Sequence, residues 1–306
     1  MTITPALRAA PAGPLAAADF GLYAGTVLVW GTTWIALKFQ LGTVDPQVSL
    51  VWRFLLAAPI MFIICRMAGA RIRFPLRDHL IFAALGLFLY STNFNLFYNA
   101  GQFVVSGMLA VIFSLASITN ILLGALFLGE PLRLRVWLGA LLGLAGVTLM
   151  FWPEMSGGDL GSGPLVGLAL GFLGCLSFST GNMISARLRR EGVPVLSMNA
   201  WGVSYGVLVN AAFALVAGSA FIVEPSTPYI LSLLWLAIPG SVLAFWMYIA
   251  LLGRIGADRA GYTTVLSPVL ALLISTVVED YQWSALAVAG LVMVAAGNVL
   301  VLRRDA

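Results

Sequence analysis

Hydrophobic residues fill long continuous runs along this 306-residue chain, and short polar segments separate the runs. A helix that crosses a membrane needs about 20 consecutive, mostly apolar residues. The runs do not alternate between apolar and polar residues, as the strands of a membrane barrel do. The pattern therefore predicts ten transmembrane helices. They are expected at residues 20–38, 47–67, 80–98, 104–128, 136–151, 165–185, 195–217, 229–252, 257–278 and 283–302.

Composition supports the same fold class. Hydrophobic residues make up 61% of the chain and charged residues only 9%, whereas a soluble domain carries about 25% charged residues. We therefore predict an all-α integral membrane protein. Residues 1–18 are rich in alanine and proline and lack a continuous apolar core, so they are interpreted as a flexible cytoplasmic tail and not as a cleaved signal peptide.

Basic residues gather in the loops on one side of the predicted helices. These are Arg8, Arg66, Arg71, Arg73, Arg77, Arg133, Arg135, Arg187, Arg189, Arg190, Arg254, Arg259, Arg303 and Arg304. The loops of the other side carry Asp45, Glu154, Asp159, Glu224, Glu279 and Asp280. Because basic loops stay in the cytoplasm, both termini are expected there, in a multi-pass protein of the inner membrane. The net charge of +4 then reflects topology, and no nucleic-acid partner is expected.

The second half of the sequence echoes the first. Three pairs of residues lie 149 positions apart: Glu130 and Glu279, Trp52 and Trp201, and Lys38 and Arg187. Gly139 and Gly146 recur 151 positions later as Gly290 and Gly297. An offset near half the chain length indicates an internal duplication. Five helices per copy is an odd number, so the second copy should enter the membrane with the opposite orientation.

This duplication sets the expected domain organisation. We assign residues 19–152 to the first repeat, 153–163 to a periplasmic linker, 164–302 to the second repeat and 303–306 to a cytoplasmic tail. Inverted repeats are typical of secondary transporters, whose substrate site lies near the middle of the membrane between the two copies.

Several kinds of chemistry are missing from the sequence. His79 is the only histidine and Lys38 the only lysine, and no phosphate-binding loop is present. We therefore expect no enzyme activity, no metal site and no cofactor. Cys65 and Cys175 fall inside apolar runs, which favours buried thiols over a disulfide.

Charged residues inside the predicted helices are few. Every acidic residue lies in a tail, in a loop or at a helix end, so coupling through a membrane-embedded carboxylate is disfavoured. Arg53 lies about five residues into the second helix. It can snorkel to the interface or form a structural pair, or it can guide a substrate carboxylate. Lys38 has the same two interpretations.

Polar and aromatic residues inside the helices are candidates for lining a substrate cavity. They are Trp30, Trp34, Tyr90, Asn93, Ser114, Phe178, Asn182, Trp246, Tyr262 and Ser267. The alternative for each polar residue is a hydrogen bond between neighbouring helices, which is common in membranes. Pro268 lies within the ninth helix, where a kink would make it a candidate gate.

Three segments resemble a known family. Residues 30–39 (WGTTWIALKF), 52–57 (WRFLLA) and 128–132 (LGEPL) are similar to the EamA-domain branch of the drug/metabolite transporter superfamily. The resemblance implies ten helices, an inverted repeat and a cavity between the bundles. Bacterial members of this branch include exporters of amino acids. The second copy, residues 278–281 (VEDY), keeps the acid and lacks the preceding glycine.

The expected function is export of small metabolites through a central cavity between the repeats, by uncoupled facilitated diffusion. Amino acids, including aromatic and other bulky neutral ones, are the favoured substrates. One alternative is transport of phosphorylated or nucleotide-sugar metabolites, which would need several basic residues in the cavity. Another is a membrane-embedded lipid-modifying enzyme. The expected partners are the substrate and the lipid bilayer, with a monomer favoured over a dimer.

Overall fold

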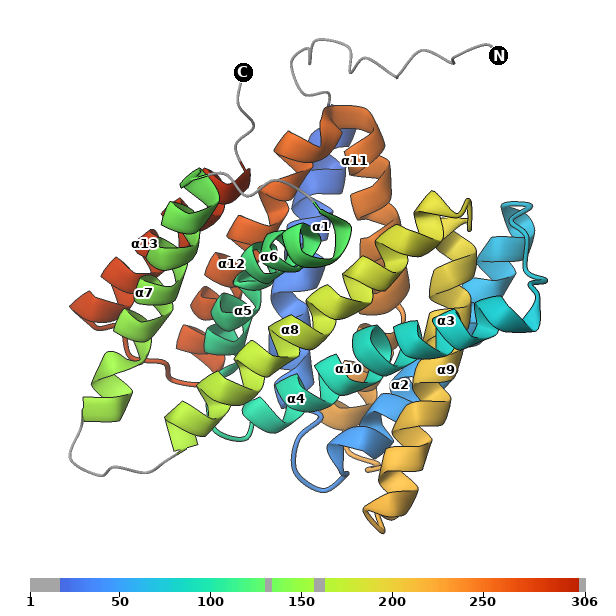
Figure 1. Ribbon diagram of the computed structural model, residues 1–306. Coiled ribbons are helices and arrows are strands. Elements are labelled where there is room, and N and C mark those ends of the chain that lie inside the picture. The colour runs from blue at the N-terminus through green and yellow to red at the C-terminus, as the bar shows by residue number, and fades with distance from the viewer. Residues whose placement is uncertain (1–16, 130–133, 157–162, 303–306) are drawn as a thin grey trace, which may run out of the picture.

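The computed structural model describes residues 17–129, 134–156 and 163–302, and in these ranges the regular structure is helical, without strands. Eight helical stretches are long and apolar enough to cross a membrane, and two shorter apolar helices follow them (Figure 1). The elements are α1 (Ala17–Lys38), α2 (Pro46–Met67), α3 (Leu76–Leu87), η1 (Phe88–Thr92), α4 (Asn93–Ala100), α5 (Ser106–Ser114), α6 (Ala116–Leu128), α7 (Leu134–Ser156), α8 (Gly163–Arg190), α9 (Val195–Val216), α10 (Thr227–Ala237), η2 (Pro239–Leu243), α11 (Ala244–Gly261), α12 (Thr263–Val278) and α13 (Ala285–Leu302).

The helices match the predicted apolar runs, with three local differences. The expected continuous helices at 80–98 and 229–252 each contain a π-helical turn, η1 and η2. The run at 104–128 is broken at Leu115. The expected start of the ninth helix at residue 257 was wrong, because α11 continues to Gly261. Hydropathy indicates which segments cross the membrane. It does not indicate where the backbone hydrogen bonds change from the α-helical to the π-helical pattern.

The π-helical turn η1 is stabilised by side chains from distant helices. Ser177 of α8 donates through Oγ to the carbonyl of Phe88 at 2.8 Å. Asn210 of α9 donates through Nδ2 to the carbonyl of Tyr90 at 3.1 Å, and its Oδ1 accepts a hydrogen bond from Ser91. A π turn disturbs the regular helical ladder and is frequently found at functional sites. These bonds therefore fix an irregular helix between the two halves of the chain.

The backbone itself repeats. The two π turns begin at Phe88 and Pro239, which are 151 positions apart. All described residues with a positive φ also form pairs across the repeat, at offsets of 149 to 151. The pairs are Gly42 and Gly192, Gly69 and Gly218, and Gly129 and Asp280. Corresponding turns in the two copies thus share an unusual conformation, which supports the duplication independently of residue identity.

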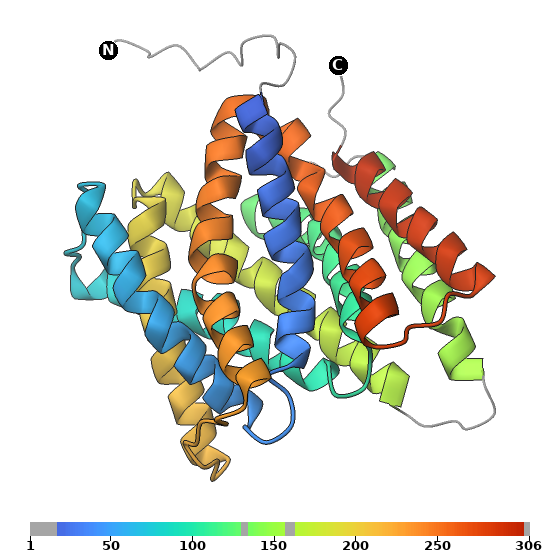
Figure 2. The same ribbon diagram turned by 180° about the vertical axis from the view of Figure 1, so that it is seen from behind.

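Helix packing follows the same internal symmetry. The first helix of the first copy, α1, packs against α11 and α12 of the second copy. The first helix of the second copy, α8, packs against α4 and α6 of the first. The last helices of the copies, α7 and α13, pack on each other at one side of the molecule (Figures 1 and 2). Each copy therefore buries its first helix in the other copy.

Close contact between α7 and α13 depends on glycine. A Cβ atom on Gly146 would lie 2.6 Å from the carbonyl oxygen of Gly290, and one on Gly139 would lie 2.7 Å from that of Gly297. These are the repeated glycines of the sequence. Small residues let helices approach closely in membranes, and here they join the ends of the two copies. Cys65 and Cys175 are free and buried, as predicted.

Candidate functional site

Arg53 lies buried at the junction of the two copies. Its exposed fraction is 5%, so the side chain does not snorkel to a membrane interface. Its guanidinium carbon lies 4.6 Å from the ring centroid of Phe94 and 5.3 Å from that of Phe54. No ion pair to Arg53 is formed within the described ranges. A buried cation without a carboxylate is costly, so its charge is available for an anionic group.

The hydroxyl of Ser241 in η2 holds Arg53 in place. Nε and Nη2 of Arg53 lie 3.3 Å and 3.2 Å from Ser241 Oγ. The Ser241 hydroxyl donates its proton to the carbonyl of Leu236 at 2.8 Å, so its lone pairs face the guanidinium. A neutral hydroxyl orients the cation without neutralising it. The π turn of the second copy thus positions the arginine of the first.

Two buried polar atoms of α4 make no well-formed hydrogen bond within the part of the chain that the structure describes. They are Oδ1 of Asn93, which is 3% exposed, and the hydroxyl of Tyr98, which is 0% exposed and lies beside the Arg53 guanidinium. Tyr98 follows Phe94 by four positions, which places both on the helix face toward Arg53. A buried polar group left unpaired costs roughly 1–3 kcal/mol. Both atoms are therefore candidates for contact with a polar substrate.

Four aromatic side chains form a cluster in the same hydrophobic core as Tyr98. Trp34 of α1 lies 5.4 Å from Phe97 of α4 and 5.5 Å from Phe113 of α5, measured between ring centroids. Phe113 lies 4.9 Å from Phe178 of α8. Both copies contribute, because α8 begins the second copy. Such rings offer an apolar surface with defined edge and face contacts.

Most of the predicted cavity residues make contacts between or within helices. The ring of Trp30 lies 5.0 Å from that of Tyr248, and the hydroxyl of Tyr90 donates to Asn199 Oδ1 at 3.1 Å. Nδ2 of Asn182 donates to Asn120 Oδ1 at 3.0 Å. The hydroxyls of Ser114 and Ser267 donate to carbonyls of their own helices. These polar groups already have partners.

Three predicted residues lie apart from the central groups. Trp246 is 59% exposed on the outer face of α11. Tyr262 precedes α12 and lies near Tyr23, at the end of the molecule where α1 begins. Pro268 is accommodated within α12, which continues to Val278. Glu130 lies outside the described residues.

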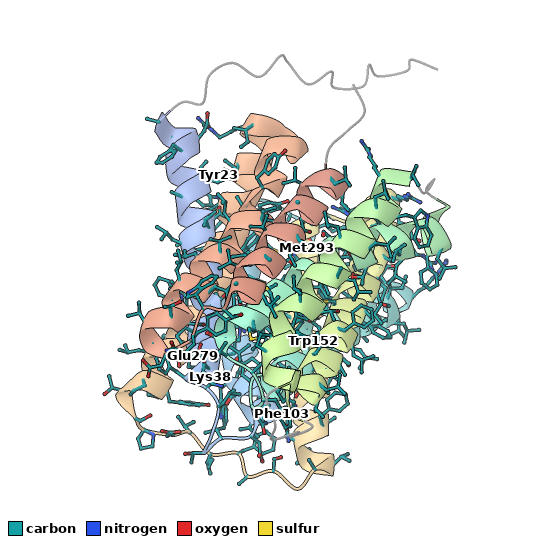
Figure 3. The ribbon with its side chains drawn as sticks, turned by 90° about the vertical axis from the view of Figure 1, so that its left-hand side faces the viewer. Tyr23, Lys38, Phe103, Trp152, Glu279 and Met293 are labelled. Atoms are coloured by element: carbon teal, nitrogen blue, oxygen red, sulfur yellow. The ribbon has the colours of Figure 1, made fainter. Side chains whose placement is uncertain are left out.

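Glu279 and Lys38 meet at the opposite end of the molecule (Figure 3). The carboxylate of Glu279 accepts from the backbone N–H of Ser106 at 2.9 Å and from the hydroxyl of Ser275 at 2.7 Å. The Ser106 hydroxyl also donates to it. Because Ser106 begins α5, the carboxylate caps that helix, where negative charge is favourable. Glu279 directly follows α12 as its C-cap, and its side chain is only 9% exposed and turns into the protein.

An ion pair joins α1 and α11 at the end where α1 begins. Nε of Arg254 contacts Oδ1 of Asp19, whose side chain is largely buried. Helix α1 is thus held near both of its ends, by Asp19 at one and by Lys38 at the other.

Sequence reasoning identified Arg53, Trp34, Asn93 and Phe178 but did not select Tyr98 or Ser241. One signal could have pointed to Ser241, because it lies 151 positions after Tyr90, the offset of the glycine pairs. Tyr98 is one of several polar residues in its helix, and only burial separates it from the others.

Comparison with known proteins identifies the family. The model of the EamA-like transporter family matches residues 20–152 and 165–303. An uncharacterized inner membrane transporter, YedA of Escherichia coli K12, is 28% identical over 281 residues, which cover 90% of this chain and 88% of the relative. A probable amino-acid metabolite efflux pump of the same strain is 25% identical over 289 residues, covering 90% and 93%. One crystal structure shares the fold with a TM-score of 0.66 at 19% identity, covering 94% of this chain and 96% of the other.

Proposed function

Because this chain belongs to the EamA-like transporter family, we propose that this inner-membrane transporter exports amino acids, including aromatic and other bulky neutral ones. One observation carries the proposal: Arg53 is a buried cation that forms no ion pair with a carboxylate of the described ranges, and it lies among aromatic rings. A relative of 25% identity is named a probable amino-acid metabolite efflux pump, which agrees with this substrate class.

The groups of the candidate site suit the parts of an amino acid. The guanidinium and the Tyr98 hydroxyl donate to the carboxylate, because charge-assisted hydrogen bonds to carboxylates are strong. The unpaired Oδ1 of Asn93 accepts from the ammonium group. The cluster of Trp34, Phe97, Phe113 and Phe178 contacts the substrate side chain. The substrate thus supplies an anionic partner for Arg53 and a donor for Oδ1 of Asn93.

The transport path requires ten membrane crossings in two oppositely oriented repeats, with both termini in the cytoplasm. Helix α1 begins and α13 ends at the same end of the molecule (Figure 2), as an even number of crossings demands. The arginine-rich loops then lie in the cytoplasm and Glu279 lies on the outer side. Exchange of conformation between the two copies would open the centre to each side in turn.

Transport is proposed to be uncoupled facilitated diffusion. A proton-driven carrier often keeps a carboxylate in the membrane as a relay. In the described part of the chain, the buried acids Asp19 and Glu279 lie at helix ends and are bonded to Arg254, Ser106 and Ser275. Arg53 as a single cation also suits one carboxylate better than the doubly charged phosphate of a sugar phosphate.

The substrate class is tested by exchange in proteoliposomes. Vesicles loaded with unlabelled tryptophan, phenylalanine, methionine or threonine should take up the corresponding labelled amino acid faster than vesicles without protein. An imposed pH gradient should leave the final distribution unchanged, because no proton is coupled. Exchange of a sugar phosphate or a nucleotide sugar, with no exchange of these amino acids, would reject the proposal. Accumulation driven by the pH gradient would reject the uncoupled mechanism.

A further inference from the structure

A cavity of about 400 Å³ opens at the end of the molecule that carries Lys38 and Glu279. Its walls come from the connection between α1 and α2 and from the connection between α4 and α5. Lys38, Asp45 and Gln102 supply its polar side chains. The volume falls within the range of small-molecule sites, about 300–1,000 Å³. The central residues around Arg53 do not contribute to it.

The ammonium group of Lys38 is held at the cavity wall with donor capacity left over. Its Nζ donates to the carbonyl of Gly101 at 2.7 Å and to that of Val104 at 3.4 Å. Glu279 Oε1 is 3.9 Å away, which is an ion-pair distance but too long for a hydrogen bond. An ammonium has three N–H donors, and the Lys38 side chain is 33% exposed. One donor direction is therefore free for a ligand.

Glu279 does not depend on Lys38 for its hydrogen bonds. The backbone and hydroxyl of Ser106 and the hydroxyl of Ser275 already donate to its carboxylate. A ligand carboxylate can thus approach Lys38 while Glu279 continues to cap α5. The protein therefore orients the Lys38 ammonium through backbone carbonyls and leaves part of it accessible to a ligand.

Asp45 provides the opposite charge in the same cavity. It precedes α2, its side chain is exposed, and it makes no capping hydrogen bond to that helix. A cation and an exposed carboxylate in one small cavity complement a zwitterion. We propose that this cavity is a second binding site for amino acids, in which Lys38 binds the carboxylate of the ligand and Asp45 its ammonium group. The ligand class rests on the proposed function, whereas the site rests on the cavity and its charges.

The site is tested by protection of a cysteine at the cavity wall. Gln102 lines the cavity and is exposed, so Gln102→Cys should react with a membrane-impermeant methanethiosulfonate added from outside. The native cysteines are buried and should remain unlabelled. Phenylalanine at about ten times its Kd should slow labelling about tenfold, since roughly a tenth of the sites stay empty. Phenylpyruvate, which lacks the ammonium group, and phenethylamine, which lacks the carboxylate, should protect less.

Three variants in the Gln102→Cys background assign the contacts. Lys38→Met should abolish protection by phenylalanine and by phenylpyruvate. Asp45→Asn should reduce protection by phenylalanine to that given by phenylpyruvate. Arg53→Met should retain full protection, because the central residues are not part of the cavity. Undiminished protection in Lys38→Met, or loss of protection in Arg53→Met, would overturn the proposal.

Exchange measured on the same vesicles separates the two proposals. If the vesicles exchange amino acids but phenylalanine does not protect Gln102→Cys, the second binding site is rejected and the carrier function stands. Protection that depends on Lys38, without exchange, supports the site and rejects the carrier function.

Discussion

Replacement of Arg53 by methionine should reduce amino-acid exchange by at least roughly 30-fold and leave the protein folded. Methionine fills a similar volume, and replacing a buried charge by an apolar side chain is often neutral or stabilising. Loss of a buried charged partner for the substrate carboxylate costs about 2–5 kcal/mol, which corresponds to a loss of roughly 30-fold or more. Exchange of labelled phenylalanine in proteoliposomes measures the effect at low substrate concentration.

Two matched variants separate the charge of Arg53 from its hydrogen bonds. Arg53→Lys keeps the charge but loses the forked donors that reach Ser241, so exchange should be only partly retained. Arg66→Met removes an exposed arginine from the last turn of the same helix and should leave exchange unchanged. If Arg53→Met exchanges at the wild-type rate with an unchanged melting temperature, Arg53 does not bind substrate.

Replacement of Glu279 by glutamine should loosen the end of the transporter at which α12 meets α5. The carboxylate links α12 to the start of α5 through Ser106 and Ser275. A hydrogen bond to a charged group contributes about 1.5–3 kcal/mol, and the neutral glutamine amide leaves one acceptor oxygen in place of the two that the carboxylate offers to Ser106 and Ser275. We expect a lower melting temperature. Val104, which is 5% exposed beside the start of α5, should become more reactive as a cysteine to a water-soluble thiol reagent.

The neighbouring Asp280 provides the control. It is exposed and has a φ of 54°, which asparagine also tolerates, so Asp280→Asn removes the same charge without touching the cluster. Its stability and the reactivity of Val104→Cys should stay at wild-type values. Equal behaviour of the Glu279 and Asp280 variants would mean that Glu279 does not close this end.

The fold was largely predictable because membrane helices carry their signal locally. Each apolar run is helical, although π turns or the break at Leu115 divide three of them, since the backbone in hydrocarbon has to satisfy its own hydrogen bonds. The π turn at Phe88 was not predictable from its own residues. It depends on Ser177 and Asn210, which lie about 90 and 120 positions later in the chain.

The candidate site was predictable only in part. Arg53 stood out because charge is rare within apolar runs, and Trp34 and Phe178 because aromatic rings suit a cavity. Tyr98 is distinguished from its polar neighbours by its burial. Glu279, which the sequence places in a loop, caps α5 through its hydrogen bond with the backbone of Ser106. The environments of Tyr98 and Glu279 depend on which helices pack together, and hydropathy alone does not determine the helix packing. The role of Trp246 was equally hidden, because the sequence does not report which face of α11 points outward.

Opposite orientation of the two repeats is the central claim, and labelling of two equivalent residues tests it most directly. Ala68 and Ala217 are exposed, end α2 and α9 as C-caps, and lie 149 positions apart. The inverted repeat predicts that an impermeant maleimide labels Ala217→Cys in intact spheroplasts and labels Ala68→Cys only after the membrane is opened. Labelling of both cysteines from the same face would contradict the inverted arrangement and the transport path built on it.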